Sequence, residues 1–140
     1  MKTIPKIEKY MTTTPHTVGN DIPIKKAFSM MREHSIRHLP VQHGGKLVGV
    51  LTDRDIKLAS SFKIGNEELK VEDVMTPDPF TVSPESNLDQ VVADMAEHKY
   101  GCAIVVHKSN QYEHGKVVGI FTANDGLKVL SEILLKNYKL

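Results

Sequence analysis

The feature that most constrains the fold is an internal repeat. The segment 7–18 aligns without gaps with the segment 71–82, 64 positions later, and six extra residues enter the second copy after His107. Half of a 140-residue chain is too short to bury a large core by itself. The repeat therefore predicts two copies of one small motif that pack around a common core. The identical pairs in the opening segments are Glu8/Glu72, Met11/Met75, Thr12/Thr76, Pro15/Pro79, Thr17/Thr81 and Val18/Val82.

Each copy predicts the same order of elements, which is strand, helix, strand, strand, helix. A proline followed within three residues by Thr-Val gives a short extended segment, and an apolar stripe with i, i+3, i+4, i+7 spacing then indicates an amphipathic helix. Two apolar strands follow, and a second helix begins at a threonine. The fold class is therefore α+β, with repeats at 7–61 and 71–134 and a polar linker at 62–70. The stripe residues are Ile24, Ala27, Phe28 and Met31 in one copy and Leu88, Val91, Val92 and Met95 in the other.

Turn and cap residues mark the ends of these elements. The segments 20–23 and 85–87 contain the polar residues and the proline that are typical of helix starts. Gly44 and Gly45 suit a tight hairpin between the first pair of strands. In the second copy the corresponding connection is the longer polar segment 108–115, for which we expect a mobile surface loop.

Composition excludes several classes of function. The chain has 18 Lys and Arg against 17 Asp and Glu, and it has no tryptophan, so neither a basic surface nor a stacking platform for nucleic acid is expected. Its start lacks the apolar core of a signal peptide, and no apolar run is long enough to cross a bilayer. The single cysteine, Cys102, fits a reducing compartment. We therefore expect a cytoplasmic protein that binds neither nucleic acid nor membranes.

Neither the cysteine nor the seven histidines predict catalysis or a metal centre. Cys102 has apolar neighbours and no base close to it in sequence, which is typical of a packed thiol and not of a nucleophile. His34 and His38 are four residues apart, but the segment joins a helix end to a strand and lacks the glutamate of a zincin motif. We expect no metal site and no enzymatic activity.

The junction between a strand and the second helix has the form Thr-x-x-Asp in both copies, at 52–55 and 122–125. A threonine with an acidic residue three positions later is the capping-box pattern, which needs no ligand. A helix N-terminus is also an anion site, where the threonine hydroxyl could hold a phosphate and the aspartate could accept hydrogen bonds from both hydroxyls of a ribose. The pattern alone leaves both interpretations open.

Taken together, these residues resemble a tandem pair of cystathionine-β-synthase (CBS) domains, which is also called a Bateman module. The resemblance rests on MTTTPHTV and MTPDPFTV, on IRHLPV, and on the two Gly-apolar-apolar-Thr-x-x-Asp junctions that begin at Gly49 and Gly119. It covers about 7–134, and the first half particularly resembles stand-alone bacterial members and the acetoin-utilisation type. It implies a pseudo-two-fold pair of repeats and a homodimer in which four copies form a flat disc. The packing faces would be the long helices, especially those that contain Phe28, Met31 and Met95.

The resemblance also implies a ligand. CBS pairs bind adenosyl compounds, such as AMP, ADP, ATP or S-adenosylmethionine, in clefts between the copies, as regulatory ligands and not as required cofactors. By position, the ribose ligands would be Asp55 and Asp125. The phosphate ligands would be Thr52, Thr122, Arg37, His38 and Arg54. The adenine slots would be formed around Thr17, Val18, Pro40, Val41, Thr81, Val82, Ile104 and Val105.

The second copy departs from the pattern of the first. Gly101 and Cys102 stand where the first copy has an arginine and a histidine, and Gly126 follows the junction aspartate where the first copy has an isoleucine. Glycine costs about 1 kcal/mol relative to alanine inside a helix. We therefore expect two unequal sites, and the one built on Thr52 and Asp55 is the better nucleotide site.

The function that these observations predict is regulatory. The module would sense the level of an adenine nucleotide and report it by a conformational change to an unidentified protein. The alternative is a ligand-free module for structural dimerisation or partner docking, in which the threonine–aspartate pairs act only as helix caps.

Overall fold

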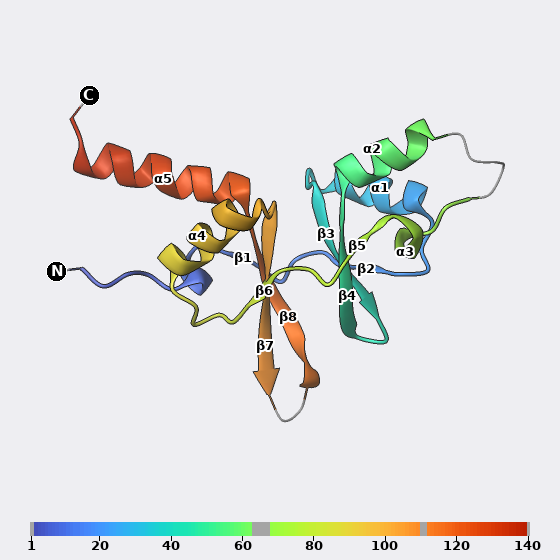
Figure 1. Ribbon diagram of the computed structural model, residues 1–140, viewed down its shortest axis with the longest axis horizontal. Coiled ribbons are helices and arrows are strands. Elements are labelled where there is room, and N and C mark those ends of the chain that lie inside the picture. The colour runs from blue at the N-terminus through green and yellow to red at the C-terminus, as the bar shows by residue number, and fades with distance from the viewer. Residues whose placement is uncertain (1, 63–67, 110–111, 140) are drawn as a thin grey trace. The chain divides into compact units, whose positions relative to one another are not determined.

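The computed structural model describes residues 2–62, 68–109 and 112–139 (Figure 1). The chain forms two compact units. Unit 1 consists of Met1–Thr14 and Phe80–Leu140, and unit 2 consists of Pro15–Pro79. Each unit therefore contains the opening segment of the other sequence repeat, so the units are offset from the repeats by the length of these segments.

Unit 2 is built on a four-stranded mixed sheet with the order β2-β3-β4-β5. The first pair of strands in this order is parallel and the other two pairs are antiparallel. The helices of the unit pack their apolar faces on this sheet. In chain order, the elements are β2 (Val18–Gly19), α1 (Ile24–Glu33), β3 (His38–His43), β4 (Lys46–Thr52), α2 (Asp53–Ser61), α3 (Val71–Val74) and β5 (Thr76–Pro77).

Unit 1 repeats this arrangement with the sheet order β1-β8-β7-β6. Here β6 is parallel to β7, and β8 lies antiparallel to both of its neighbours. Its last helix is longer than the equivalent helix of unit 2. In chain order, the elements are η1 (Ile7–Lys9), β1 (Thr12–Thr13), β6 (Thr81–Val82), α4 (Leu88–His98), β7 (Cys102–Ser109), β8 (Tyr112–Thr122) and α5 (Ala123–Asn137).

Buried apolar side chains form one cluster in each unit, and each cluster combines residues of both sequence repeats. Each opening segment adds a buried side chain, Ile7 in unit 1 and Val71 in unit 2, to the core that it joins. Met31 and Met95 lie inside these cores, at 2% and 6% exposure, so neither side chain forms an outer packing face.

The predicted strands of the first copy and the turn between them are confirmed. β3 and β4 cover the two apolar segments, and Gly44 and Gly45 join them with φ values of +56° and +80°. A two-residue hairpin of the primed type needs positive φ at both positions, which glycine adopts without steric cost.

Pro23 and Asn87, from the segments predicted to open the first helices, are the N-cap residues of α1 and α4, but they do not cap through their side chains. Neither α1 nor α4 has a side-chain hydrogen bond at its N-cap. The Ile24 amide instead donates to the Leu69 carbonyl over 3.0 Å, and the Leu88 amide donates to the Pro5 carbonyl over 2.9 Å. Backbone carbonyls just before the exchanged opening segments thus accept the hydrogen bonds of the first amides of the two helices. These contacts join residues far apart in the chain, so no local sequence pattern reveals them.

The polar insertion of the second copy is not a long loop. β7 continues to Ser109 and β8 begins at Tyr112, and these two residues are paired across the hairpin. The insertion therefore lengthens the two strands, and only 110–111 fall outside the described residues. Each copy also contains two elements that the sequence did not predict, namely a helical turn and a short edge strand.

Each exchanged segment places a methionine against a strand glycine. Met75 lies on Gly49 of β4, where an added Cβ would be 2.6 Å from Met75 Sδ and 2.8 Å from the Thr76 carbonyl oxygen. Met11 lies on Gly119 of β8, where an added Cβ would meet only atoms of the Met11 side chain. Gly49 is therefore needed for the close approach of the opening segment, whereas at Gly119 the methionine side chain would have to move.

We predict that Gly49→Ala lowers the free energy of unfolding by about 1–3 kcal/mol, because the new methyl group overlaps the backbone of β5. Gly126→Ala is the matched control. Its Cβ would meet only Phe121 ring atoms at 3.8 Å and beyond, so it should stabilise α5 by up to about 1 kcal/mol. Urea unfolding measures both values, and an unchanged stability of Gly49→Ala would contradict the packing described here.

Candidate functional site

The two strand-to-helix junctions form complete capping boxes. In unit 2, the Asp55 amide donates to Thr52 Oγ1 over 3.1 Å, and the Thr52 amide donates to Asp55 Oδ2 over 3.2 Å. In unit 1, the equivalent distances at Thr122 and Asp125 are 3.1 and 2.9 Å. The capping prediction is confirmed in both copies.

The capping boxes leave part of each polar group unused. Among the described residues, no hydrogen bond or ion pair involves Oδ1 of Asp55 or Asp125. Each threonine hydroxyl accepts a hydrogen bond in the box and retains its own proton for donation. The amide of the second helical residue, Arg54 or Asn124, is a donor that neither box uses. Each junction therefore presents an acceptor and a donor that could meet a ligand.

The structure brings the predicted phosphate ligands of unit 2 together. The Asp53 amide donates to the Arg37 carbonyl over 3.1 Å, and His38 lies opposite Thr52 in the β3–β4 ladder. The exposed Arg54 follows in the first turn of α2. The backbones of Arg37 and His38 therefore lie next to the start of α2, and Arg54 lies in its first turn, where the N-terminal end of the helix dipole favours an anion.

Unit 1 has the same backbone arrangement without these basic residues. The Ala123 amide donates to the Gly101 carbonyl over 2.9 Å, and Cys102 lies opposite Thr122 in the β7–β8 ladder. The sequence differences between the copies thus fall at structurally equivalent positions, next to the start of α2 in unit 2 and of α5 in unit 1.

The predicted adenine-slot residues lie on paired strands within each unit, except Thr17, which directly precedes β2. In unit 2, Val18 of β2 is opposite Val41 of β3, and in unit 1, Thr81 and Val82 of β6 are opposite Ile104 and Val105 of β7. The β3 and β7 side chains belong to the buried interior. A ligand at this edge would therefore meet mainly backbone atoms and the side chains at 17 and 81, the first half-buried and the second exposed.

Pro40 creates a difference between the two units that sequence reasoning missed. In unit 1, the Ile104 amide donates to the Phe80 carbonyl over 2.9 Å. Pro40 and His16 occupy the equivalent positions in unit 2, and proline has no amide hydrogen. The His16 carbonyl therefore does not receive this hydrogen bond. Only the pairing of the two strands reveals the consequence, because the residues are far apart in sequence.

Ring stacking also joins side chains that the sequence did not connect. The rings of His16 and His34 are stacked with their centroids 3.7 Å apart, and Phe80 stacks on Tyr100 at 4.8 Å in the other unit. In the described part of the chain, no group of three or more His, Cys, Asp or Glu side chains could hold a metal ion. Within the same residues, no helix is both long and apolar enough to span a bilayer.

Cys102 is a buried thiol with 7% exposure. Burial raises its pKa from 9.0 to about 11, so the thiol is protonated at neutral pH. A neutral, enclosed thiol is a poor nucleophile, and this arrangement agrees with the predicted packing role.

The chain belongs to the CBS domain family, whose model matches residues 7–61 and 71–132. Together with the two similar units described above, this match defines the chain as a CBS domain pair.

Known relatives place the pair in different contexts. The chain is 36% identical over 124 residues to inosine-5'-monophosphate dehydrogenase of Korarchaeum cryptofilum, which covers 89% of this chain and 24% of that protein. The chain thus spans about a quarter of the length of that relative. It also resembles a Vibrio cholerae protein assigned to acetoin utilization (AcuB), with 28% identity, a TM-score of 0.79 and coverage of 99% of this chain and all of the other.

A third structure contains ligands. The CBS domain pair of protein MJ0100, solved in complex with 5'-methylthioadenosine and S-adenosyl-L-methionine, matches with 26% identity and a TM-score of 0.79. The match covers 94% of this chain and 99% of that one.

The pKa of Cys102 predicts a component of stability that depends on pH. Between about pH 9 and pH 11 the unfolded chain loses the thiol proton while the folded chain keeps it. The free energy of unfolding therefore falls as the pH rises through this range. Urea unfolding at about pH 8 and about pH 11 should show that the wild type loses about 2 kcal/mol more than Cys102→Ala. Equal losses in the two proteins would contradict the burial effect.

Proposed function

We propose that this chain is a regulatory module that binds an adenosyl ligand at its threonine–aspartate junctions. The observation that carries the proposal is the unused half of each junction, namely Oδ1 of the aspartate and the hydroxyl proton of the threonine. The CBS pair of MJ0100, which binds two adenosyl compounds, supports this ligand class at 26% identity. AMP, ADP, ATP and S-adenosylmethionine share the adenosine group that the junction would recognise.

The aspartate performs two tasks in this proposal. One carboxylate oxygen stays on the amide of the capping threonine, which fixes the orientation of the side chain. The other accepts hydrogen bonds from the ribose hydroxyls, and hydrogen bonds to a charged acceptor contribute about 1.5–3 kcal/mol each. Because the cap orients the carboxylate before the ligand arrives, little side-chain entropy is lost on binding.

The junction of unit 2 is the better site in this proposal. The backbones of Arg37 and His38 lie next to the start of α2 and Arg54 lies in its first turn. A phosphate at this helix start would accept hydrogen bonds from the threonine hydroxyl and the helix amides. Pro40 has no amide hydrogen to donate to the His16 carbonyl. This carbonyl would instead accept a hydrogen bond from the exocyclic amino group of adenine. Unit 1 lacks both features, so its junction would bind the nucleotide more weakly.

The biological role would be regulatory and not catalytic. We propose a cytoplasmic homodimer that changes conformation when the ligand binds and passes this change to a partner protein. Such coupling requires that the ligand bind two conformations with different affinity. A free, buried thiol at Cys102 is compatible with a reducing compartment.

A second candidate function is a ligand-free docking or dimerisation module. The specific observation in its favour is that both capping boxes are complete without any ligand. In this case the duplicated aspartates would serve helix stability alone, and removal of one cap would cost about 1 kcal/mol.

The variant Asp55→Asn separates the two functions of this side chain. The asparagine oxygen can still accept the hydrogen bond of the Thr52 amide, whereas the asparagine amino group cannot accept a hydrogen bond from a ribose hydroxyl. We predict a small change in melting temperature and at least about a tenfold weaker affinity for AMP. Isothermal titration calorimetry and thermal shift measure the two effects, with S-adenosylmethionine as a second ligand.

Asp53→Asn is the matched control for this experiment, because Asp53 lies in the same helical turn but faces Lys57 at 3.5 Å. It should bind AMP as the wild type does. If Asp55→Asn also retains full affinity, the ribose role is wrong. If neither AMP nor S-adenosylmethionine stabilises the wild type, the docking module is the better account.

The His16 carbonyl predicts selectivity for an amino group on the purine. IMP carries a carbonyl where AMP carries this amino group, so the wild type should bind AMP about tenfold more tightly than IMP. Pro40→Ala supplies an amide hydrogen that can donate to the His16 carbonyl. Because this carbonyl is then no longer available to the purine amino group, the preference for AMP over IMP should become smaller. A preference that is absent in the wild type, or unchanged in Pro40→Ala, would contradict this assignment.

A further inference from the structure

The opening segments of the two repeats carry a methionine at the same position, and the proposed ligand site uses neither. Met75 is the C-cap residue of α3 and directly precedes β5, and its amide donates to the Val71 carbonyl over 2.9 Å. Met11 has the same place before β1, and its amide donates to the Ile7 carbonyl over 3.0 Å. Each methionine therefore lies between the buried residue of its segment and the short strand that pairs with the sheet.

The sulfur atom of each methionine lies directly on a strand backbone. A Cβ added at Gly49 would be 2.6 Å from Met75 Sδ, and a Cβ added at Gly119 would also overlap Met11 Sδ. Real atoms do not approach this closely, so no further atom fits between either sulfur and its strand. Both side chains also pack against the apolar core of their unit.

The two cores suit a thioether and do not suit its oxidised form. Among the described residues, no polar or charged side chain is buried. A thioether is apolar and polarizable, whereas a sulfoxide carries a polar oxygen that needs a hydrogen-bond donor or water. Oxidation at either methionine therefore favours a position of the side chain in water, away from its glycine.

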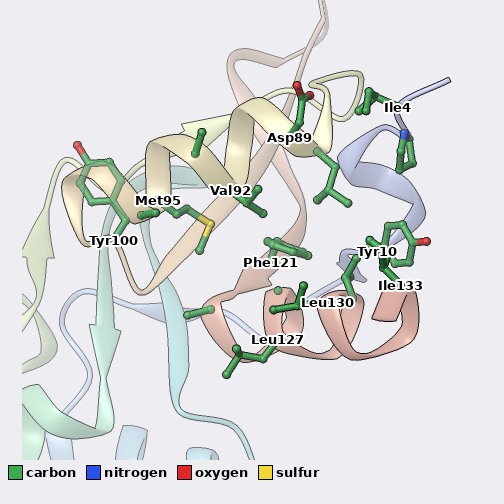
Figure 2. Close-up of a pocket in the computed structure, with 17 residues that line it drawn as sticks. Ile4, Tyr10, Asp89, Val92, Met95, Tyr100, Phe121, Leu127, Leu130 and Ile133 are labelled. Atoms are coloured by element: carbon green, nitrogen blue, oxygen red, sulfur yellow. The ribbon is translucent and has the colours of Figure 1, made fainter. Parts of the chain in front are cut away.

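Both methionines are open to an oxidant. Their side chains are half-buried, whereas Met31 and Met95 are only 2% and 6% exposed. Figure 2 shows Met95 on the side of α4 that faces Phe121, within the core of unit 1. Cys102 is no competing target, because burial raises the pKa of this thiol and leaves it protonated at neutral pH.

The packing of the methionines supports a short contact. β5 pairs with β4 at two positions, Gly49 with Pro77 and Val50 with Thr76, and β1 pairs with β8 at two positions as well. A ladder of this length contributes few hydrogen bonds. The methionine side chain is therefore a main part of the contact that holds each opening segment on its sheet.

We propose that Met11 and Met75 are oxidation sites, and that their conversion to sulfoxides by a peroxide releases the opening segments from their units. The thioether sulfur donates an electron pair to one oxygen of hydrogen peroxide, so that an S–O bond forms and the O–O bond breaks. The leaving hydroxide takes the proton of the transferred oxygen and departs as water. Methionine sulfoxide reductases reverse the modification. This response to oxidants is independent of the proposed ligand.

The first test is the rate of oxidation at each methionine. The folded wild type is treated with hydrogen peroxide, and peptide mass spectrometry follows the addition of one oxygen atom at each position. Met11 and Met75 should react at least about tenfold faster than Met31 and Met95, because oxidation of the buried side chains requires that the core open first. Equal rates at all four positions overturn the proposal.

The second test measures the release of the segments. The oxidised wild type should melt at least about 4 °C lower than the untreated protein. Trypsin should also cleave it faster after Lys70, because Val71 is fully buried while its segment is in place. Methionine sulfoxide reductases should restore both values. An oxidised protein whose melting temperature and cleavage rate are unchanged contradicts the release.

Leucine variants identify which sulfur atoms are responsible. The double variant Met11→Leu and Met75→Leu keeps apolar side chains of similar volume that cannot be oxidised, so peroxide should change neither its melting temperature nor its cleavage. Met30→Leu is the matched control, because Met30 is also half-buried but lies on α1 and not on an opening segment. It should respond to peroxide as the wild type does.

The outcomes decide between these positions and other targets of the oxidant. A double variant that loses stability in peroxide as the wild type does overturns the assignment to Met11 and Met75. If circular dichroism shows that the double variant does not fold, the reductase treatment of the wild type decides instead. Recovery of the melting temperature must then coincide with loss of the sulfoxides at positions 11 and 75, and recovery without that loss overturns the proposal.

Discussion

The arrangement at each junction depends on the amide groups at the start of the second helix. These amides have no partner within the helix, and the threonine and aspartate of the capping box satisfy two of them in each unit. The amide of the first helical residue, Asp53 or Ala123, is satisfied by a carbonyl of the segment before the neighbouring strand. The cap therefore fixes the direction in which the helix leaves the sheet and the orientation of the carboxylate. A ligand site at this position depends on that fixed orientation.

Duplication preserved this junction while the surroundings diverged. Both units retain the capping box, the paired strands and the methionine that packs on a strand glycine. They differ where Pro40 replaces an amide donor and where Cys102 replaces a histidine beside the junction. They differ also in the helix that follows the junction, because α2 of unit 2 has 9 residues and α5 of unit 1 has 15 residues. The divergence thus leaves the basic residues beside the junction in unit 2 and most of the exposed large apolar side chains in unit 1.

Local patterns were sufficient to predict much of this structure. The Thr-x-x-Asp spacing identified both caps, and Gly44-Gly45 identified the hairpin, because these signals act over a few residues. Long-range features were missed. The exchange of opening segments, and the capping of α1 by the Leu69 carbonyl, depend on contacts between residues far apart in the chain. Val92 fits the apolar stripe of α4 by spacing, yet it is exposed, because periodicity does not show where a core ends.

The central claim is that one carboxylate serves both the helix cap and the ligand, and a crystal structure with AMP tests it most directly. The account predicts that Asp55 Oδ2 remains on the Thr52 amide while Oδ1 accepts hydrogen bonds from the ribose hydroxyls, at about 2.5–3.0 Å. A bound AMP whose ribose lies away from both aspartates would contradict the account. Crystals that contain no nucleotide at a saturating concentration of AMP would contradict it as well.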